Sequence, residues 1–278
     1  MIEEHCSPEG ATGSEEVSAG LPQMSDSEIM RLLLSEDESR SQEESEVAAS
    51  IGEQMLHMDL PIMARSVRAR IRDICSRVSP SNAVLVGGGI GHLSAWLFDL
   101  WCTSDEDNYP PIARPSSFRI IEPGTRFRVI IERLIRRYEA DSWAEVISME
   151  WQEAIAESTS ALASNISLPE GALKSPLTLP INLVVVDLPE ESRVEAVTSA
   201  FEIVSPGGLV ISLEPTVPTG DVGEIDEEEG PNPAQKKVQS FNEWIDLIKR
   251  VNENHSVGFA ELSGGSIVGL LKGDSTHH

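Results

Sequence analysis

Apolar residues recur along this chain with two spacings, and their alternation predicts the order of its elements. Short continuous apolar runs, such as Val184 to Val186, are typical of strands that are buried on both faces of a sheet. Between these runs, apolar residues recur every three or four positions, which is typical of helices that pack through one face. Strands that alternate with helices predict a doubly wound, Rossmann-like α/β fold with a mostly parallel sheet.

Seven strands are predicted from these runs. Five of them are the segments "NAVLVGG", "SFRIIEP", "AEVISME", "INLVVVDLP" and "PGGLVISLEP", with helices between them. The last two, "SVGFAEL" and "SIVGLLKG", are separated by Gly264 and Gly265, so we expect a C-terminal hairpin that adds an antiparallel edge to the sheet. Two helices are expected before the first strand, within residues 47–80.

The first fifty residues differ from the rest in charge. They hold thirteen Asp and Glu against only Arg31 and Arg40, in a chain of net charge −25. Ser, Glu and Gly dominate much of this stretch, which has too little apolar surface to offset the entropy lost on ordering. We therefore expect a largely disordered acidic tail at 1–46, with one short helix at "SDSEIMRLLL", and a folded domain at 47–273 whose Rossmann-like core begins at residue 81. A solvating brush, an adaptation to salt and a docking segment all fit such a tail.

The composition also narrows the location and partners. An acidic chain disfavours nonspecific binding to nucleic acid or to an anionic membrane. The sequence has no run of eighteen apolar residues and does not start like a signal peptide, so we expect a cytoplasmic protein. Cys6, Cys75 and Cys102 lack a metal-binding spacing and are interpreted as ordinary thiols.

The segment "VLVGGGIGHLSAWL" is the main candidate for a binding site. Gly87, Gly88, Gly89 and Gly91 lie between the first strand and a helix, where ligands bind in open α/β sheets. Glycine permits positive φ and lets a ligand lie against the backbone, and the helix start offers unpaired N–H groups. The segment predicts a nucleotide-like cofactor, and the alternative is a tight turn without a ligand.

The second strand narrows the choice of cofactor. It ends at Glu122, where an acidic side chain can accept hydrogen bonds from the hydroxyls of an adenosine ribose, although a helix-capping role is the alternative. A dinucleotide site favours G-x-G-x-x-G, whereas this chain has G-x-G-x-G followed by His92. The tighter spacing favours S-adenosylmethionine, which carries no phosphate. An NAD-dependent oxidoreductase stays an alternative.

These segments resemble the class I S-adenosylmethionine-dependent methyltransferases, in particular the small-molecule O-methyltransferases that act on catechol and caffeoyl-CoA. The resemblance spans roughly residues 55–273 and includes "RIIEPGTRFRVIIERL", "ISMEWQEAI", "INLVVVDLPEE" and "SPGGLVIS". It implies a homodimer with S-adenosylmethionine as cofactor. It also implies roles for individual residues: the methionine part of the cofactor lies on Gly87, Gly89 and Gly91, the ribose on Glu122, the adenine between Trp151 and Gln152, and the methyl group and acceptor beside Asp187.

The sequence departs from this family at two places. Leu85 stands where the family has an acid two positions before the first glycine. Leu213 and Glu214 stand where the metal-dependent branch has an Asp-Asn pair, although Asp187 keeps the first ligand position. Asp187 and Glu214 are the catalytic candidates and could hold Mg²⁺ with waters, but the lost pair favours transfer without a metal.

The sequence as a whole predicts a methyltransferase that acts on an oxygen of a small molecule. We expect the acceptor above Asp187 and Glu214, under the N-terminal helices and the loop 216–233. The lysine that family members use near the acceptor aligns with Glu190, so the usual base is lost. His92 could replace it, but a packing or capping role is favoured. The alternative from another class is a degenerate relative that keeps the fold and has a binding or regulatory role.

Overall fold

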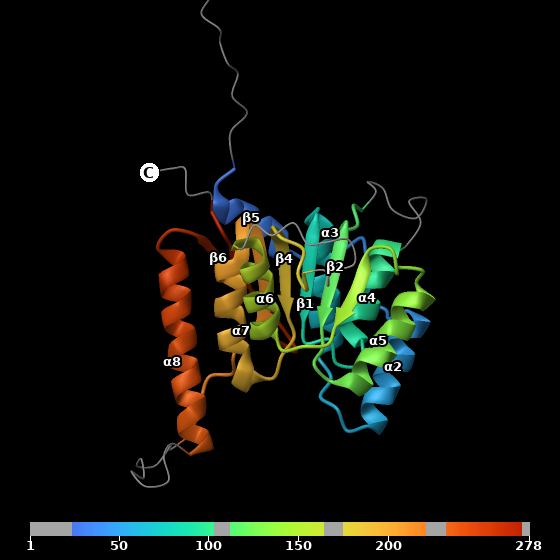
Figure 1. Cartoon of the computed structure of the whole chain (residues 1–278). Coiled ribbons are helices and arrows are strands. Elements are labelled where there is room, and N and C mark those ends of the chain that lie inside the picture. The colour runs from blue at the N-terminus through green and yellow to red at the C-terminus, as the bar shows by residue number, and fades with distance from the viewer. Residues whose placement is uncertain (1–23, 103–111, 164–174, 221–231, 274–278) are drawn as a thin grey trace, which may run out of the picture.

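One sheet of seven strands carries the fold (Figure 1). The structure, a computed structural model, describes residues 24–102, 112–163, 175–220 and 232–273. The strands are β1 Asn82–Val86, β2 Ser117–Ile121, β3 Ala144–Ile147, β4 Ile181–Val186, β5 Val204–Leu213, β6 Ser256–Leu262 and β7 Gly265–Leu271. None of the helices among these residues has the length and apolar character needed to cross a membrane.

The strand order is β3-β2-β1-β4-β5-β7-β6, which confirms the predicted fold class. The first five strands in sequence pair in parallel, and β7 pairs antiparallel with both β5 and β6. The hairpin therefore inserts its second strand beside β5 and leaves β6 at the edge. The chain order reverses around β1, so the carboxyl ends of β1 and β4 lie side by side at the switch point of the sheet.

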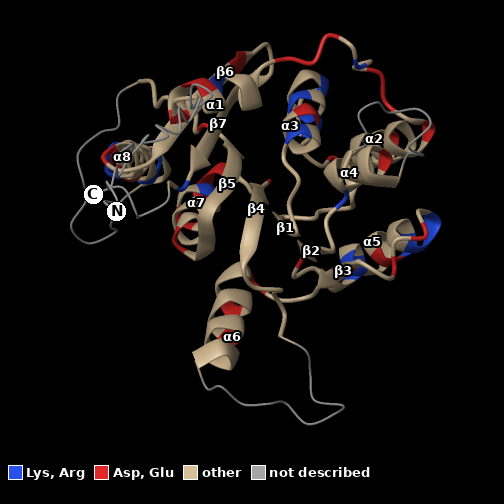
Figure 2. Ribbon diagram, turned by 90° about the horizontal axis from the view of Figure 1, so that it is seen from above, with Lys and Arg blue, Asp and Glu red and all other residues tan. Residues whose placement is uncertain are grey.

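Helices cover both faces of the sheet (Figure 2). One face carries α2 Glu46–His57, α3 Arg65–Arg77, α4 His92–Cys102 and α5 Thr125–Arg137, and the other carries α6 Trp151–Ala163, α7 Glu190–Ile203 and α8 Pro233–Asn252. Alternate strand residues serve the two layers: Leu85 packs in the first core, and Val84 and Val86 pack in the second. This double burial explains the continuous apolar runs of the strands.

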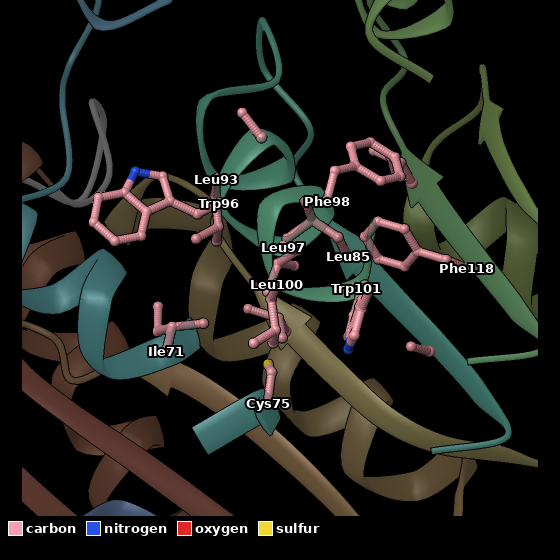
Figure 3. Packing of buried hydrophobic residues seen from close by; sticks show 14 of the residues in the cluster. Ile71, Cys75, Leu85, Leu93, Trp96, Leu97, Phe98, Leu100, Trp101 and Phe118 are labelled. Carbon is pink, nitrogen blue, oxygen red and sulfur yellow. The ribbon is translucent and has the colours of Figure 1, made fainter. Parts of the chain in front are cut away.

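Aromatic side chains fill the core under α4 (Figure 3). The ring centroid of Phe118 lies 5.7 Å from that of Phe98 and 5.1 Å from that of Trp101, in edge-to-face contacts. Leu85, at 0% exposure, lies in the same cluster. The acid that the family has at this position would be buried in this apolar layer, so its replacement by leucine is consistent with the packing.

The predicted boundary at residue 46 is wrong for the segment 24–46. Helix α1 Asp26–Leu34 lies where the short helix was expected, and its N-cap Ser25 forms a capping box with Glu28. Its Met30 and Leu34 are 2% and 4% exposed and pack on the hairpin β6–β7, whose glycines leave room for them. The short helix was expected, but its composition did not show that two buried side chains dock it on the hairpin. Residues 1–23 of the predicted tail lie outside the described residues.

Further contacts hold the segment that follows α1. Arg70 of α3 donates to the carbonyl of Leu34 at 2.8 Å, and Arg77 donates to the carbonyl of Ser35 at 2.7 Å. Arginine side chains of α3 therefore donate to the last backbone carbonyl of α1 and to the carbonyl that follows it. With the hydrogen bonds from Arg72 to the carbonyl of Ser41 and from Arg68 to Glu44, these contacts hold the segment 34–44 against α3.

Deletion of residues 1–45 is expected to destabilise the protein. Loss of Met30 and Leu34 from the core should cost on the order of 3 kcal/mol or more of unfolding free energy, because each buried side chain of this size contributes about 1.5–3 kcal/mol. Thermal and urea unfolding measure the effect, with deletion of 1–23 as the matched control. An unchanged melting temperature after deletion of 1–45 would show that α1 adds no stability.

Candidate functional site

The loop between β1 and α4 packs tightly against its neighbours. Gly87 has a φ of +93°, and a Cβ added there would lie 2.1 Å from the carbonyl oxygen of Asp187. A Cβ added at Gly88 would lie 2.7 Å from Ile120, and one at Gly91 would lie 2.9 Å from Leu134. These three glycines are required by the close approach of the backbone to β4, β2 and α5.

Gly89 has a different environment. Its φ is +51°, but a Cβ added there would meet no atom within 4 Å. The space in front of Gly89 is therefore open, whereas the rest of the loop is packed. The positive φ explains a glycine at this position of a tight turn, and the open space in front of it is what distinguishes Gly89 from the three packed glycines. The bare backbone at Gly89 is where a ligand can lie against the loop.

Glu122, at the end of β2, is bound to this loop. Its Oε2 accepts a hydrogen bond of 2.7 Å from the N–H of Gly89, and its Oε1 accepts one of 2.8 Å from the N–H of Gly124. The side chain is buried, and burial raises the pKa of Glu122 although both backbone hydrogen bonds act to lower it. Each carboxylate oxygen keeps a second lone pair that can accept from a hydroxyl group. The structure thus brings together two residues that the sequence assigned to one cofactor.

Asp187 follows β4 and lies beside the first glycine. Its N–H donates to the carbonyl of Val86 at 2.8 Å, which continues the β1–β4 pairing past the strand. Burial raises the pKa of Asp187 to about 6, while the positive charges of Arg193 and Arg68 act to lower it. A carboxyl group with this pKa changes charge near neutral pH, which suits a residue that accepts a proton.

Trp151 and Gln152 are both engaged with α7. The buried indole of Trp151 donates to Ser199 Oγ at 3.0 Å and to the carbonyl of Ala196 at 3.3 Å. Gln152 is exposed and donates to Ser199 Oγ at 3.1 Å, at the edge of a hollow of about 460 Å³ between α6, α7 and α8. Trp151 therefore serves as a packing residue here, and the adenine contacts assigned to both side chains stay predictions.

Glu214 follows β5, next to β4 in the sheet. Its N–H donates to the carbonyl of Ser266 at 2.7 Å, so the backbone there is held by β7. Leu213, in the place of a family metal ligand, offers no donor atom. Within the described part of the chain, no group of three His, Cys, Asp or Glu side chains could hold a metal ion. Two carboxylates alone do not fit the ligand set of the metal-dependent branch, and the chemistry below uses no metal.

The sequence analysis missed a buried network at the start of α4. Three donors converge on one oxygen of Glu44, Oε1: Arg68 Nη2 at 2.5 Å, His92 Nε2 at 3.0 Å and Trp96 Nε1 at 3.3 Å. Burial lowers the pKa of His92 and the charge of Arg68 lowers it further, so His92 is neutral at pH 7 and donates from Nε2. Its contact is structural, as the favoured interpretation expected. One sequence signal was available, because His92 and Trp96 are four residues apart and share a helix face.

Comparison with known proteins gives a consistent result for the fold. No family model and no curated protein matches the sequence. Among solved structures, the chain is similar to an O-methyltransferase from Bacillus cereus in complex with S-adenosylhomocysteine, with 12% identity over 89% of this chain and 98% of that chain and a TM-score of 0.57.

Two further structures are similar over comparable lengths. The O-methyltransferase TomG from Streptomyces achromogenes, in complex with S-adenosylmethionine, has 17% identity over 89% of this chain and 96% of that one, at a TM-score of 0.54. An S-adenosylhomocysteine-bound methyltransferase from Podospora anserina has 10% identity over 89% and 94%, at a TM-score of 0.55. The chain thus has the Rossmann-like fold of class I S-adenosylmethionine-dependent methyltransferases.

The pKa of Asp187 predicts a pH-dependent stability. Between pH 4 and pH 6 the unfolded chain ionises Asp187 before the folded protein does, so the wild type loses stability as pH rises through this window. Asp187→Asn removes this titration. The unfolding free energy of the variant should therefore rise relative to that of the wild type by on the order of 2 kcal/mol from pH 4 to pH 7. Urea unfolding at several pH values tests this, and a pH-independent difference would contradict the assignment.

Proposed function

We propose that this protein is an S-adenosylmethionine-dependent methyltransferase that methylates an oxygen atom of a small molecule. The observation that carries the proposal is the open backbone at Gly89, held at 2.7 Å by the carboxylate of Glu122. The site lies at the switch point of the sheet, where ligands of such folds bind. The likeness to three methyltransferase structures supports it.

In this proposal, different residues at the switch point bind different parts of the cofactor. The methionine part lies along Gly87, Gly89 and Gly91, and the ribose hydroxyls donate to the free lone pairs of Glu122. Because this cofactor carries no phosphate, the short G-x-G-x-G turn can hold it without a pyrophosphate site. The antiparallel strand β7 beside β5 also distinguishes this sheet from the mostly parallel sheet of dinucleotide-binding domains.

Asp187 and the first glycine then lie at the reacting end. The bound cofactor supplies an electrophilic methyl group on a sulfonium, and transfer breaks its C–S bond as the acceptor oxygen forms a new C–O bond. Asp187 accepts the proton that leaves the acceptor hydroxyl, since a pKa of about 6 leaves it mostly ionised at pH 7. Alignment of the nucleophile with the methyl group supplies much of the remaining rate.

The acceptor is proposed to lie above Asp187 and Glu214. In this proposal, the start of the loop 216–233 borders the acceptor site. There the N–H of Thr216 donates to Glu190 Oε1 at 3.0 Å. Residues 221–231 of that loop lie outside the described residues. The net charge of −25 supports a small molecule rather than a nucleic acid as acceptor. We also propose that the protein is cytoplasmic and forms a homodimer.

Substitution of Glu122 tests the cofactor site. Glu122→Ala should weaken binding of S-adenosylhomocysteine by roughly 1–3 kcal/mol, because the buried ribose hydroxyls lose their acceptor. Isothermal titration calorimetry measures the effect, and Glu150→Ala, at an exposed neighbouring acid, is the matched control that should bind like the wild type. Unchanged affinity in Glu122→Ala would refute the assigned role.

The same calorimeter separates the competing functions. Folded wild-type protein that gives no heat with S-adenosylmethionine or S-adenosylhomocysteine would exclude both the enzyme and a regulatory protein that senses this cofactor. Tighter binding of NADH than of S-adenosylmethionine would instead favour the oxidoreductase.

A further inference from the structure

Arg68 of α3 is buried beside the proposed cofactor site and has unused hydrogen-bonding capacity. Its side chain is 4% exposed, Nη2 donates to Glu44 at 2.5 Å and Nη1 donates to the carbonyl of Met63. Nε has no hydrogen-bond partner among the described residues. A guanidinium is costly to bury, and a buried N–H without an acceptor adds to that cost. An unpaired donor of this kind in a folded protein calls for a functional explanation.

The position of Arg68 relates it to both ends of the glycine loop. Its partner Glu44 is hydrogen-bonded to His92, which directly follows Gly91. On the other side, the charge of Arg68 acts on Asp187, beside Gly87. Hydrogen bonds through Glu44 therefore connect the guanidinium to His92, at the end of the loop along which the methionine part of the cofactor is proposed to lie.

The methionine part of S-adenosylmethionine ends in an ammonium and a carboxylate, and both need partners in a site that excludes water. Leu85 shows that the usual acid before the loop is absent, and its side chain is committed to the apolar core. Recognition of this end must therefore come from other residues. Arginine suits a carboxylate because its planar N–H groups match the two oxygens.

We propose that Arg68 binds the carboxylate of the cofactor's methionine part through its Nε edge, and that Glu44 positions the guanidinium for this contact. The inference rests on the proposed function and extends it to the amino-acid end of the cofactor. Glu44 accepts from Nη2 and the Met63 carbonyl accepts from Nη1, so these two contacts orient the guanidinium without occupying Nε. His92 and Trp96 hold the same oxygen of Glu44 and so act through it as positioning residues.

Entry of the carboxylate requires movement in the wall around Nε, which protein atoms cover. The segment 60–64 between α2 and α3 has no helix or strand, and it carries the Met63 carbonyl that accepts from Nη1. Because this segment contacts the guanidinium and lies outside any helix, we propose that its movement admits the carboxylate. Binding of the cofactor would then replace a buried unpaired donor with a charged hydrogen bond.

Two ligands that differ only at the methionine end test the proposal. S-Adenosylhomocysteine carries the carboxylate, and 5′-methylthioadenosine has the same thioether and adenosine without the amino-acid end. The paired variant Arg68→Met with Glu44→Met removes both charges together, so that no buried carboxylate is left unpaired. We expect at least a tenfold loss of affinity for S-adenosylhomocysteine and less than a twofold change for 5′-methylthioadenosine.

The chain offers a matched control on the same helix. Arg70 pairs with Glu36 at 3.4 Å and also joins α3 to the segment after α1. Arg70→Met with Glu36→Met should leave the affinity for both ligands within twofold of wild type. An equal loss for both ligands in the Arg68 variant, or no loss for S-adenosylhomocysteine, would overturn the proposal.

Folding of each variant is checked by its melting temperature and circular dichroism. If the paired Arg68 variant does not fold, Arg68→Lys replaces it, because a lysine keeps the charge but cannot present the Nε edge. Arg68→Lys should bind S-adenosylhomocysteine severalfold more weakly than the wild type and should bind 5′-methylthioadenosine with unchanged affinity. Wild-type affinity of Arg68→Lys for both ligands would overturn the proposal. Wild-type protein that binds neither ligand refutes the proposed function itself, whereas binding that is independent of Arg68 refutes only this inference.

Discussion

The hydrogen bond between the carboxylate of Glu122 and the N–H of Gly89 is the contact on which the candidate site depends. It joins the end of β2 to the loop after the neighbouring strand β1, beside the switch point between β1 and β4. A buried carboxylate is stable there because backbone N–H groups satisfy both of its oxygens. The same contact keeps the peptide of Gly89 in a fixed orientation while the space in front of it stays open. A preformed surface of this kind lowers the entropy cost of ligand binding.

The rest of the molecule holds this contact in place. The strands are buried on both faces, so alternate side chains lock them between two helical layers and fix the register of β1 against β2 and β4. That register places Asp187 against Gly87 and leaves no room for a side chain at the first glycine. The N-terminal segment adds a second support, because Glu44 ties the start of α4 to α3. The site thus depends on residues that are far from it in sequence.

The sequence predicted the elements better than their contacts. Continuous apolar runs predicted the strands because double burial is a strong local signal. The structure places the acid at the end of β2 in contact with the glycine loop, and its binding of a ribose stays a prediction. Composition failed at residues 24–46, because two buried side chains on a short helix are enough to dock it when the hairpin supplies glycines opposite. Trp151 shows the same limit, since the partners of its indole lie on α7, more than forty residues away. The buried contact between Arg68 and Glu44 was missed because only the fold brings these two residues together.

The central claim is that an adenosyl sulfonium cofactor lies on the open backbone at Gly89 with its ribose on Glu122. A crystal structure of the protein soaked with S-adenosylhomocysteine tests it most directly. The account predicts that both ribose hydroxyls lie within hydrogen-bond distance of the Glu122 carboxylate and that the methionine part follows the loop from Gly87 to Gly91. Electron density for the ligand at any other place, or a loop filled by the protein's own side chains, would contradict it.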